Sequence, residues 1–302
     1  MVNFMSKEKI KIFFTDFWPN FVLNDNYFYH LLKQKYDVTI SNTKPDILFF
    51  SVDYSNKKDH LKFDNSSTKK IFYTGENINP NFDNCDAALS FNPSTENNFR
   101  LPLWVLFLNW FHVPYSKNRD QSYLLNIEKL TSSNKILKPN KKFCSFIASK
   151  PEGKRMEFFD KLNAFEEVSS AGRLFNNTKS IKGRGDQKWK MKYLKKYKFN
   201  LALENSSTPG YVTEKILHSM YANSIPIYWG APDVALDFNE KSFIDINNYN
   251  NDEDAVQDIL DIYSNKQRYL EILREPWFEN NTVPLQFHPE KVLEFIENQL
   301  NS

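Results

Sequence analysis

The segment FNLALENSSTPGYVTEKILHSMYANSIPIYWGAP, residues 199–232, has the clearest structural pattern in the chain. Its apolar run at residues 199–203 predicts a buried strand, and a polar loop follows it. Residues 213–222 carry apolar side chains at helical spacing, and residues 225–229 form a second apolar run. A strand, a helix and a strand in succession are the unit from which helix-covered parallel sheets are built.

Polar side chains are concentrated between the first strand and the helix, at Glu204, Asn205, Tyr211, Thr213, Glu214 and Lys215. In parallel sheets the carboxyl ends of the strands face the ligand crevice, so we expect these side chains to line a cleft. Thr213 is a suitable N-cap, and the N–H groups of the helix N-terminus, with the Lys215 ammonium, suit a diphosphate. Glu214 cannot bind phosphate, but it can accept hydrogen bonds from ribose hydroxyls. The segment therefore predicts a nucleotide-sugar site.

A simpler interpretation of the Glu214–Lys215 pair is two charges at the start of a helix on a solvated face. Against it stand three aromatic residues in the same segment, Tyr211, Tyr228 and Trp229, which look exposed in the sequence pattern. The pair alone is weak, and the interpretation as a binding site depends on the whole segment.

Further apolar runs and periodic stretches indicate two α/β domains. Strands are also predicted at residues 9–15, 37–40, 46–51, 69–74, 85–91, 142–149, 167–170 and 243–246, and helices at 26–35, 152–165, 187–197, 252–265, 266–273 and 289–300. Residues 116–141 are polar and weakly periodic, as a linker would be. We predict Rossmann-like domains at residues 1–115 and 142–285, and a terminal helix in 286–302 that packs back on the first domain.

Composition excludes several other classes of protein. The 302 residues carry a net charge of only +2, which gives no overall field to attract nucleic acid. Cys85 and Cys144 are the only cysteines, so no CxxC metal site exists and no disulfide framework is expected, and the histidines lack ligand spacing. The N-terminus is polar, and the apolar runs are far shorter than the ~18 residues of a spanning helix, so we expect a cytoplasmic protein.

Several motifs together resemble the α-1,3/4-fucosyltransferase family, the bacterial-like enzymes of glycosyltransferase family 10. They are GYVTEKI and IPIYWGAP in the segment above, SFI at residues 242–244, KIFYTGENINPNF at 70–82 and LPLW at 101–104. These motifs occur in the family's order, and the resemblance covers roughly residues 9–275. It implies an α/β fold of the GT-B type, with two Rossmann-like domains facing each other across a cleft.

The same resemblance implies that GDP-fucose is held mainly by the C-terminal domain. The matching donor residues are Asn205, Tyr211, Glu214 and Lys215, with Glu214 on the ribose and Lys215 and Asn205 near the phosphates. Arg173 matches the family arginine on the diphosphate, and Arg184 is an alternative for that role. An arginine suits this place because its planar fork binds phosphate oxygens bidentately.

Inverting transfer to a hydroxyl requires a base that removes the acceptor proton as the oxygen attacks. Glu76, in the loop after the strand at residues 69–74, matches the family's base. Asn77, with Asn79 and Asn81 beyond it, could orient acceptor hydroxyls, although plain turn residues are an equal alternative.

The activity implied is transfer of L-fucose to GlcNAc, or Glc, in a lactosamine-like glycan, through an α-1,3 or α-1,4 linkage. Lewis-antigen and lipopolysaccharide synthesis use such products, so the acceptor would be an oligosaccharide or a lipid-linked glycan. Two alternatives remain: another GDP-sugar as donor, or a non-catalytic glycan-binding protein on a degenerate transferase fold.

No metal or other cofactor is expected, because no Asp-x-Asp motif follows a strand. Lys215, Arg173 and the helix N-terminus would supply the positive charge, and a divalent cation could still stimulate turnover. The basic run at residues 179–198 could bind nucleic acid or an anionic membrane. We favour a solvated lysine face on an amphipathic helix, with no nucleic-acid partner and with peripheral contact to the inner membrane left open.

Overall fold

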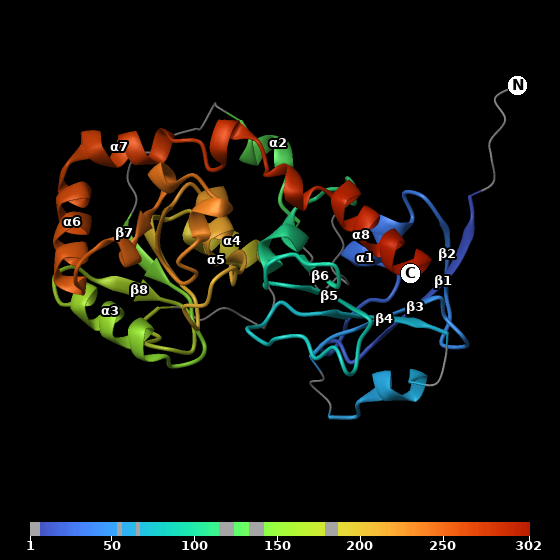
Figure 1. Cartoon of the computed structure of the whole chain (residues 1–302). Helices are drawn as coiled ribbons and strands as arrows, with labels where there is room; N and C mark the ends of the chain where they lie inside the picture. The colour runs from blue at the N-terminus through green and yellow to red at the C-terminus, as the bar shows by residue number, and fades with distance from the viewer. Residues whose placement is uncertain (1–6, 53–55, 65–66, 115–123, 133–141, 179–186) are drawn as a thin grey trace, which may run out of the picture. The chain divides into compact units, whose positions relative to one another are not determined.

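The computed structural model describes residues 7–52, 56–64, 67–114, 124–132, 142–178 and 187–302 (Figure 1). The chain forms two compact units, which are described separately. Unit 1 comprises residues 1–122 and 285–302, and unit 2 comprises residues 123–284. Of the expected linker at residues 116–141, only 124–132 lie among the described residues, where α2, Ile127–Leu130, forms one short helix.

Unit 1 contains a six-stranded sheet in the order β2-β1-β3-β4-β5-β6. Its strands are β1 Lys9–Thr15, β2 Asp37–Ile40, β3 Ile47–Phe50, β4 Lys69–Tyr73, β5 Ala87–Ser90 and β6 Asn98–Arg100. All neighbouring pairs are parallel. The polar residues that follow β1, β3 and β4 therefore lie along one edge of the sheet.

Few helices connect the strands of unit 1, and the one predicted between them, at residues 26–35, is present as a shorter helix. α1, Tyr27–Leu32, follows β1, but the connection from β3 to β4 holds only the 3₁₀ helix η1, Asp59–Phe63, and η2, Leu103–Phe107, follows β6. The connection from β4 to β5 has no helix because residues 74–86 are rich in Asn, Asp, Gly and Pro, which favour turns. The sequence pattern missed β6, which is only three residues long.

Aromatic side chains fill the centre of unit 1. The ring of Phe49 on β3 stacks on Phe14 of β1 at 5.3 Å between ring centroids and on Phe28 of α1 at 5.0 Å. All three residues are buried. Stacked rings bury large apolar areas at fixed geometry, so the high aromatic content of the sequence contributes directly to the core.

The last helix, α8 Pro289–Asn301, belongs to unit 1 and lies beside α1 (Figure 1). Tyr36 Oη donates to Glu297 Oε1 at 2.7 Å, and the same carboxylate pairs with Lys35. Just before α8, Phe287 packs edge-on against Trp104 of η2, with 5.2 Å between ring centroids. The first hundred residues and the last eighteen therefore share one core.

Unit 2 contains a five-stranded parallel sheet in the order β11-β10-β9-β7-β8. The strands are β7 Lys142–Phe146, β8 Val168–Ser170, β9 Tyr197–Leu203, β10 Ile225–Trp229 and β11 Ile244–Asp245. β9 lies in the middle of the sheet, and its last five residues are all buried. Its carboxyl end is therefore flanked by strands on both sides.

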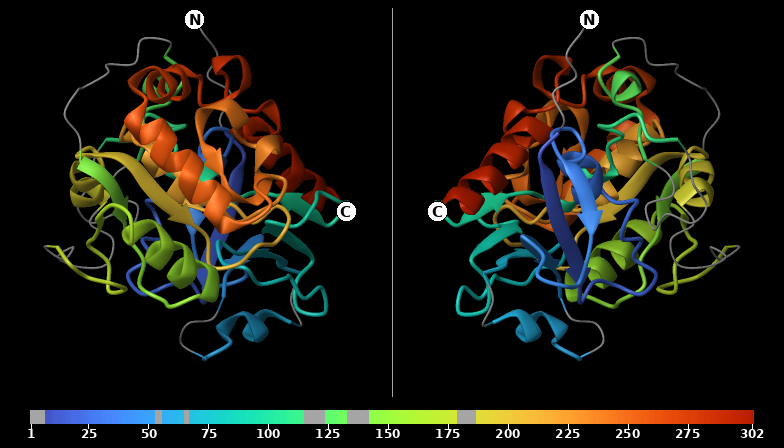
Figure 2. Two further views of the ribbon diagram at one scale, coloured as in Figure 1. Left: turned by 90° about the vertical axis from the view of Figure 1, so that its left-hand side faces the viewer. Right: turned by 90° about the vertical axis from the view of Figure 1, so that its right-hand side faces the viewer.

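The helices of unit 2 are α3 Gly153–Asn163, α4 Gln187–Leu194, α5 Glu214–Tyr221, α6 Asp252–Ser264 and α7 Lys266–Arg274. α3 and α6 lie side by side and form a core with the sheet (Figures 1 and 2). α5 packs on β9 and β10, and α4 packs on α5 and β9. Among the described residues, no helix is both long and apolar enough to cross a bilayer.

Replacing Trp104 by Ala tests how unit 1 holds its last segment. Because Trp104 is fully buried against Phe287, we expect the variant to lose about 3–5 kcal/mol of stability. Urea unfolding followed by far-UV circular dichroism measures the loss. Leu285→Ala is the matched control, because Leu285 is 71% exposed, and it should change stability by less than about 0.5 kcal/mol. Equal effects of both variants would contradict the packing role.

Candidate donor site

The candidate site is built at the carboxyl ends of β9 and β10 in unit 2. Leu203 and Trp229 are the last paired residues of these strands, and the N–H of Glu204 then donates to the carbonyl of Trp229 at 2.7 Å. The loop from residue 204 to residue 213 thus starts from a fixed point at the edge of the sheet, and α5 begins directly after it.

Glu204 is fully buried, yet its carboxylate has partners on every side. Its Oε1 accepts hydrogen bonds from the N–H and the Oγ1 of Thr213 at 2.8 and 2.7 Å. Its Oε2 accepts one from the Lys215 ammonium at 2.6 Å. A buried charge is tolerated only when it is paired in this way, so Glu204 fixes both the loop and the start of α5. Glu204 was expected to face the cleft, but it is buried and acts as a support for the loop, a role that no sequence pattern indicates.

Thr213 is the N-cap of α5, as the sequence predicts, but its side chain does not cap the helix. Its hydroxyl is directed to Glu204 instead, and it also accepts a hydrogen bond from Lys215 at 2.8 Å. Two of the three N–H donors of the Lys215 ammonium are therefore used inside the protein. With its side chain 22% exposed, Lys215 can offer the third to a phosphate oxygen.

Glu214 has a different partner from its neighbour in the sequence. Its Oε1 accepts a hydrogen bond from Lys190 of α4 at 3.0 Å. Burial favours the protonated form of this carboxyl, but the nearby Lys190 and Lys215 ammonium groups outweigh that effect and hold the pKa of Glu214 well below its usual range. Glu214 is therefore a carboxylate that can accept hydrogen bonds from a ligand.

Asn205 follows Glu204 and is half-buried. Its Oδ1 is buried and has no hydrogen-bond partner among the described residues. An unsatisfied buried acceptor costs about 1–3 kcal/mol, so a ligand that donates to it would relieve that cost. The structure thus places Asn205, Glu214 and Lys215 around the same loop and helix start.

The three aromatic residues expected to be exposed are not. Tyr211 and Tyr228 are buried, and only Trp229 is half-buried. Tyr228 lies inside the sheet on β10 and accepts a hydrogen bond from the N–H of Ala231 at 3.0 Å, and burial raises its pKa. The expectation was wrong because both faces of β10 are covered, so its aromatic residues belong to the core.

Gly230 is required where the loop after β10 passes Glu204. A Cβ atom at this position would lie 2.5 Å from Tyr228 Oη and 2.6 Å from Glu204 Cγ. Side-chain atoms cannot approach so closely, so any larger residue would displace the buried carboxylate. The WGAP motif therefore protects the packing of the site.

Arg173 lies beyond β8, two strands from β9, at the same edge of the sheet. Its side chain is exposed. The preceding Gly172 lets the turn pass the end of β7, because a Cβ atom there would lie 2.2 Å from the carbonyl oxygen of Ala148. The alternative, Arg184, lies outside the described residues.

Arg155 of α3 supports the site from a position that no sequence pattern indicates. It is buried, and its Nε and Nη2 donate to the carbonyl of Leu203 at 3.1 and 3.0 Å. Burial lowers the pKa of this guanidinium, while the Glu204 carboxylate opposes the shift. Arg155 thereby holds the end of β9 and places positive charge below the loop. An isolated arginine in a helix pattern carries no sequence signal for this role.

Glu76 lies in unit 1, in the loop after β4, and is half-buried. Its N–H donates to Thr74 Oγ1, and its carbonyl accepts from the Thr74 hydroxyl, both at 3.0 Å. The N–H of Ile78 donates to the same carbonyl at 2.8 Å. These bonds fix the backbone of Glu76 at the carboxyl end of the strand.

The asparagines after Glu76 differ in their exposure and hydrogen bonding. Asn77 is half-buried and Asn79 is exposed. Asn81 accepts a hydrogen bond from the N–H of Asp83 at 3.0 Å, which is the role of a turn residue. Asn77 therefore remains the candidate nearest to Glu76 in the loop.

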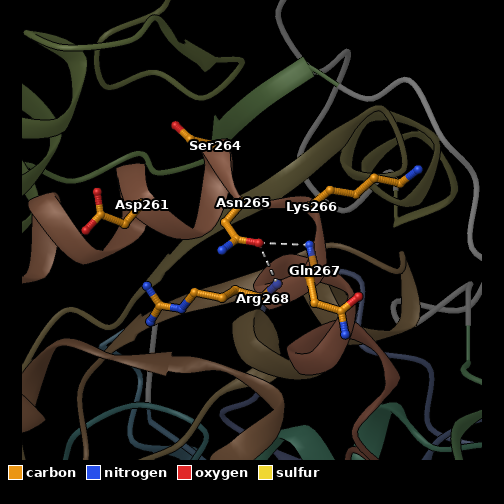
Figure 3. Close-up of a pocket in the computed structure, with 6 residues that line it drawn as sticks. All are labelled: Asp261, Ser264, Asn265, Lys266, Gln267 and Arg268. Atoms are coloured by element: carbon orange, nitrogen blue, oxygen red, sulfur yellow. Dashed lines mark hydrogen bonds between the residues drawn. The ribbon is translucent and has the colours of Figure 1, made fainter.

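A surface hollow at the junction of α6 and α7 offers no comparable chemistry (Figure 3). Asn265 Oδ1 accepts from the N–H groups of Gln267 and Arg268, so the start of α7 is already capped. Figure 3 shows Lys266 and Arg268 pointing in opposite directions. In the part of the chain that is described, no three His, Cys, Asp or Glu side chains gather as a possible metal site.

Comparison with known proteins agrees with the motifs. Residues 137–296 match the family model for the C-terminal part of glycosyltransferase family 10 (fucosyltransferase). The chain belongs to this fucosyltransferase family. Residues 12–107 also match the N-terminal domain of the α-(1,3)-fucosyltransferase FucT. This fucosyltransferase-family chain is 33% identical over 301 residues to the FucT enzyme of Helicobacter pylori.

That alignment covers 91% of this chain and 59% of the Helicobacter pylori protein. A crystal structure of an α1,3-fucosyltransferase matches with a TM-score of 0.77 and 26% identity, over 98% of this chain and 91% of that one. A crystal structure of an α1,3-fucosyltransferase with GDP-fucose matches with a TM-score of 0.71 and 28% identity, over 100% and 93%. The family member described here therefore has the GT-B fold, with two parallel-sheet α/β domains.

His218 of α5 makes the stability of unit 2 sensitive to acid. Burial, reinforced by the nearby Lys190 charge, lowers the pKa of this fully buried imidazole well below 6.5. Below about pH 6.5 the unfolded chain therefore binds a proton that the folded chain does not, and stability falls as the pH falls, by up to about 1.4 kcal/mol per pH unit.

We expect His218→Gln to reduce this slope between pH 7.5 and 5.5 in urea unfolding experiments. The control is His112→Gln, since His112 is exposed, and it should keep the wild-type slope. A wild-type slope in the His218 variant would show that another group causes the acid sensitivity.

Proposed function

We propose that the chain is an inverting α-1,3-fucosyltransferase that moves L-fucose from GDP-fucose to a carbohydrate hydroxyl. The carrying observation is the arrangement at the start of α5, where Glu204 binds Lys215 and Lys190 binds Glu214. This arrangement fixes an ammonium and a carboxylate next to each other without letting them neutralise one another. Such a pair suits a diphosphate and a ribose, and solved relatives contain GDP or GDP-fucose.

In this proposal the diphosphate lies against the third N–H of Lys215 and the exposed guanidinium of Arg173. Glu214 accepts hydrogen bonds from the ribose hydroxyls. Asn205 donates from Nδ2 to the phosphate side of the donor, and its Oδ1 accepts from a hydroxyl of the ligand. Tyr211 is buried, so it would form part of the wall of the site rather than stack on the guanine ring. Lys215 and Arg173 would also stabilise the charge that GDP gains on leaving, which is why the proposal includes no metal.

The chemical step proposed is a single displacement. Glu76 takes the proton of the acceptor hydroxyl as that oxygen forms a bond to the anomeric carbon of fucose. The bond from this carbon to the diphosphate breaks, and GDP leaves with the electron pair. We propose GlcNAc or Glc of a lactosamine-like glycan as acceptor, with Asn77 as a contact and an α-1,3 linkage, or α-1,4 as the alternative.

Two other functions are compatible with the fold: transfer from another GDP-sugar, and glycan binding without catalysis. A screen of GDP-fucose, GDP-mannose and a further GDP-6-deoxyhexose against N-acetyllactosamine and its β-1,3 isomer distinguishes them. Product with GDP-fucose alone supports the proposal, and the isomer that reacts identifies the linkage. Glycan binding with no product and no hydrolysis of any donor would reject it.

Glu76→Gln tests the proposed base. Removing a general base typically costs about 10²–10⁴-fold in rate, so we expect kcat to fall by that factor while the Kd of GDP changes by less than about twofold. Transfer assays and calorimetry measure the two quantities. The control is Glu96→Gln, at an exposed glutamate in the same unit. Retained turnover in the Glu76 variant would assign the base elsewhere.

Lys215→Ala tests the proposed phosphate contact. A hydrogen bond to a charged group contributes about 1.5–3 kcal/mol, so GDP affinity should fall about ten- to hundredfold. Calorimetry with GDP measures this effect, and Lys241→Ala provides the control at an exposed lysine of the same unit. Unchanged affinity for GDP would remove Lys215 from the donor site.

A further inference from the structure

Two described members of the basic run at residues 179–198 differ from the others: Lys198 is half-buried beside the rings of Tyr263 and Tyr269, and Lys190 is the one that lies on α4. In its described part, Lys188, Lys192, Lys195 and Lys196 are exposed, as the prediction of a solvated lysine face requires. Lys190 is only 16% exposed. It lies on α4, which packs on α5 and β9 through the buried Met191, Tyr193 and Leu194. The helix thus directs a single lysine into unit 2.

The partner of Lys190 is the carboxylate of Glu214, which is 19% exposed. The distance from Nζ to Oε1 is 3.0 Å. A pair that is shielded from water on both sides interacts more strongly than an exposed pair, because the effective dielectric constant is lower. Among the nearby charges, Lys190 has the largest effect in holding the pKa of Glu214 below its usual range.

The two carboxylate oxygens of Glu214 differ in their hydrogen bonding. Within the described residues, Oε2 has no hydrogen bond, whereas Oε1 is taken by Lys190. Lys215, the adjacent residue, is bound to Glu204 and Thr213 instead. The carboxylate therefore has one oxygen anchored in the protein and one available to a ligand.

We propose that Lys190 is a positioning residue for the donor, which anchors one oxygen of Glu214 so that the other accepts hydrogen bonds from ribose hydroxyls. This inference rests on the proposed function, because it gives Glu214 the ribose of GDP-fucose as its ligand. Lys190 itself does not contact the donor in this arrangement.

The two ammonium groups beside Glu214 have separate partners. Lys190 binds Glu214, whereas Lys215 binds Glu204 and Thr213. Loss of Lys190 therefore removes the anchor of Glu214 but leaves the partners of Lys215 in place. We expect the effect to fall on recognition of the ribose and not on recognition of the diphosphate.

The test compares GDP with 2′,3′-dideoxy-GDP, which lacks both ribose hydroxyls. In Lys190→Met, which keeps the apolar stem, calorimetry should show about a tenfold loss of affinity for GDP and less than a twofold loss for the dideoxy analogue. Lys190→Arg should restore most of the affinity. Lys192→Met, on the exposed side of the same helix, is the matched control and should bind both ligands like the wild type.

Two further measurements separate positioning from a merely structural role. In a Glu214→Gln background, Lys190→Met should cause no additional loss of GDP affinity, since the two residues act through one contact. In the single Lys190 variant, GDP affinity should begin to fall at a higher pH than in the wild type, because Glu214 is then easier to protonate.

Three results would overturn the inference: equal losses for GDP and the dideoxy analogue, no loss for either, or losses that add fully in the double variant. Binding of GDP by the wild-type chain is measured first and tests the proposed function separately. A wild type that binds no GDP rejects the donor site, and the role of Lys190 with it. A wild type that binds GDP but is indifferent to Lys190 rejects only the present inference.

Discussion

The buried carboxylate of Glu204 is the interaction on which the rest of unit 2 depends. It joins the end of β9 to the start of α5 by binding Thr213 and Lys215. Two neighbouring residues accommodate this carboxylate. Gly230 leaves room for its side chain, and the Arg155 guanidinium supplies a compensating charge. A charge removed from water must satisfy all its hydrogen bonds, so its surroundings can adopt few alternatives.

Much of the fold could be predicted because parallel strands are buried on both faces and appear as continuous apolar runs. β1, β2 and β10 have the predicted bounds, and β9 begins two residues earlier than predicted. The prediction failed where this signal is missing. β6 is too short to form a run, and η1 and η2 are short 3₁₀ helices that the sequence pattern also missed. The loop expected after the strand at residues 69–74 is present.

The candidate site could be predicted only as a set of residue types. The order of Asn205, Glu214 and Lys215 after a strand indicates a polar loop, and the structure brings them together. The choice of partner could not be predicted, because β9 and a loop separate Lys190 from Glu214, and the same loop separates Glu204 from Lys215. The burial of Tyr228 could not be predicted either. A tyrosine in a strand is compatible with a surface and with a core, and Tyr228 lies in the core.

The position of α8 has a consequence for how the chain matures on the ribosome. Residues 123–284 form unit 2 without a break, whereas unit 1 needs residues 285–302 to cover Trp104 and α1. Synthesis runs from the N-terminus, so the first-made part of the chain must wait with an incomplete core until the second unit has emerged. Unit 2 can therefore complete its core before unit 1 can, which leaves the early strands exposed to aggregation for longer.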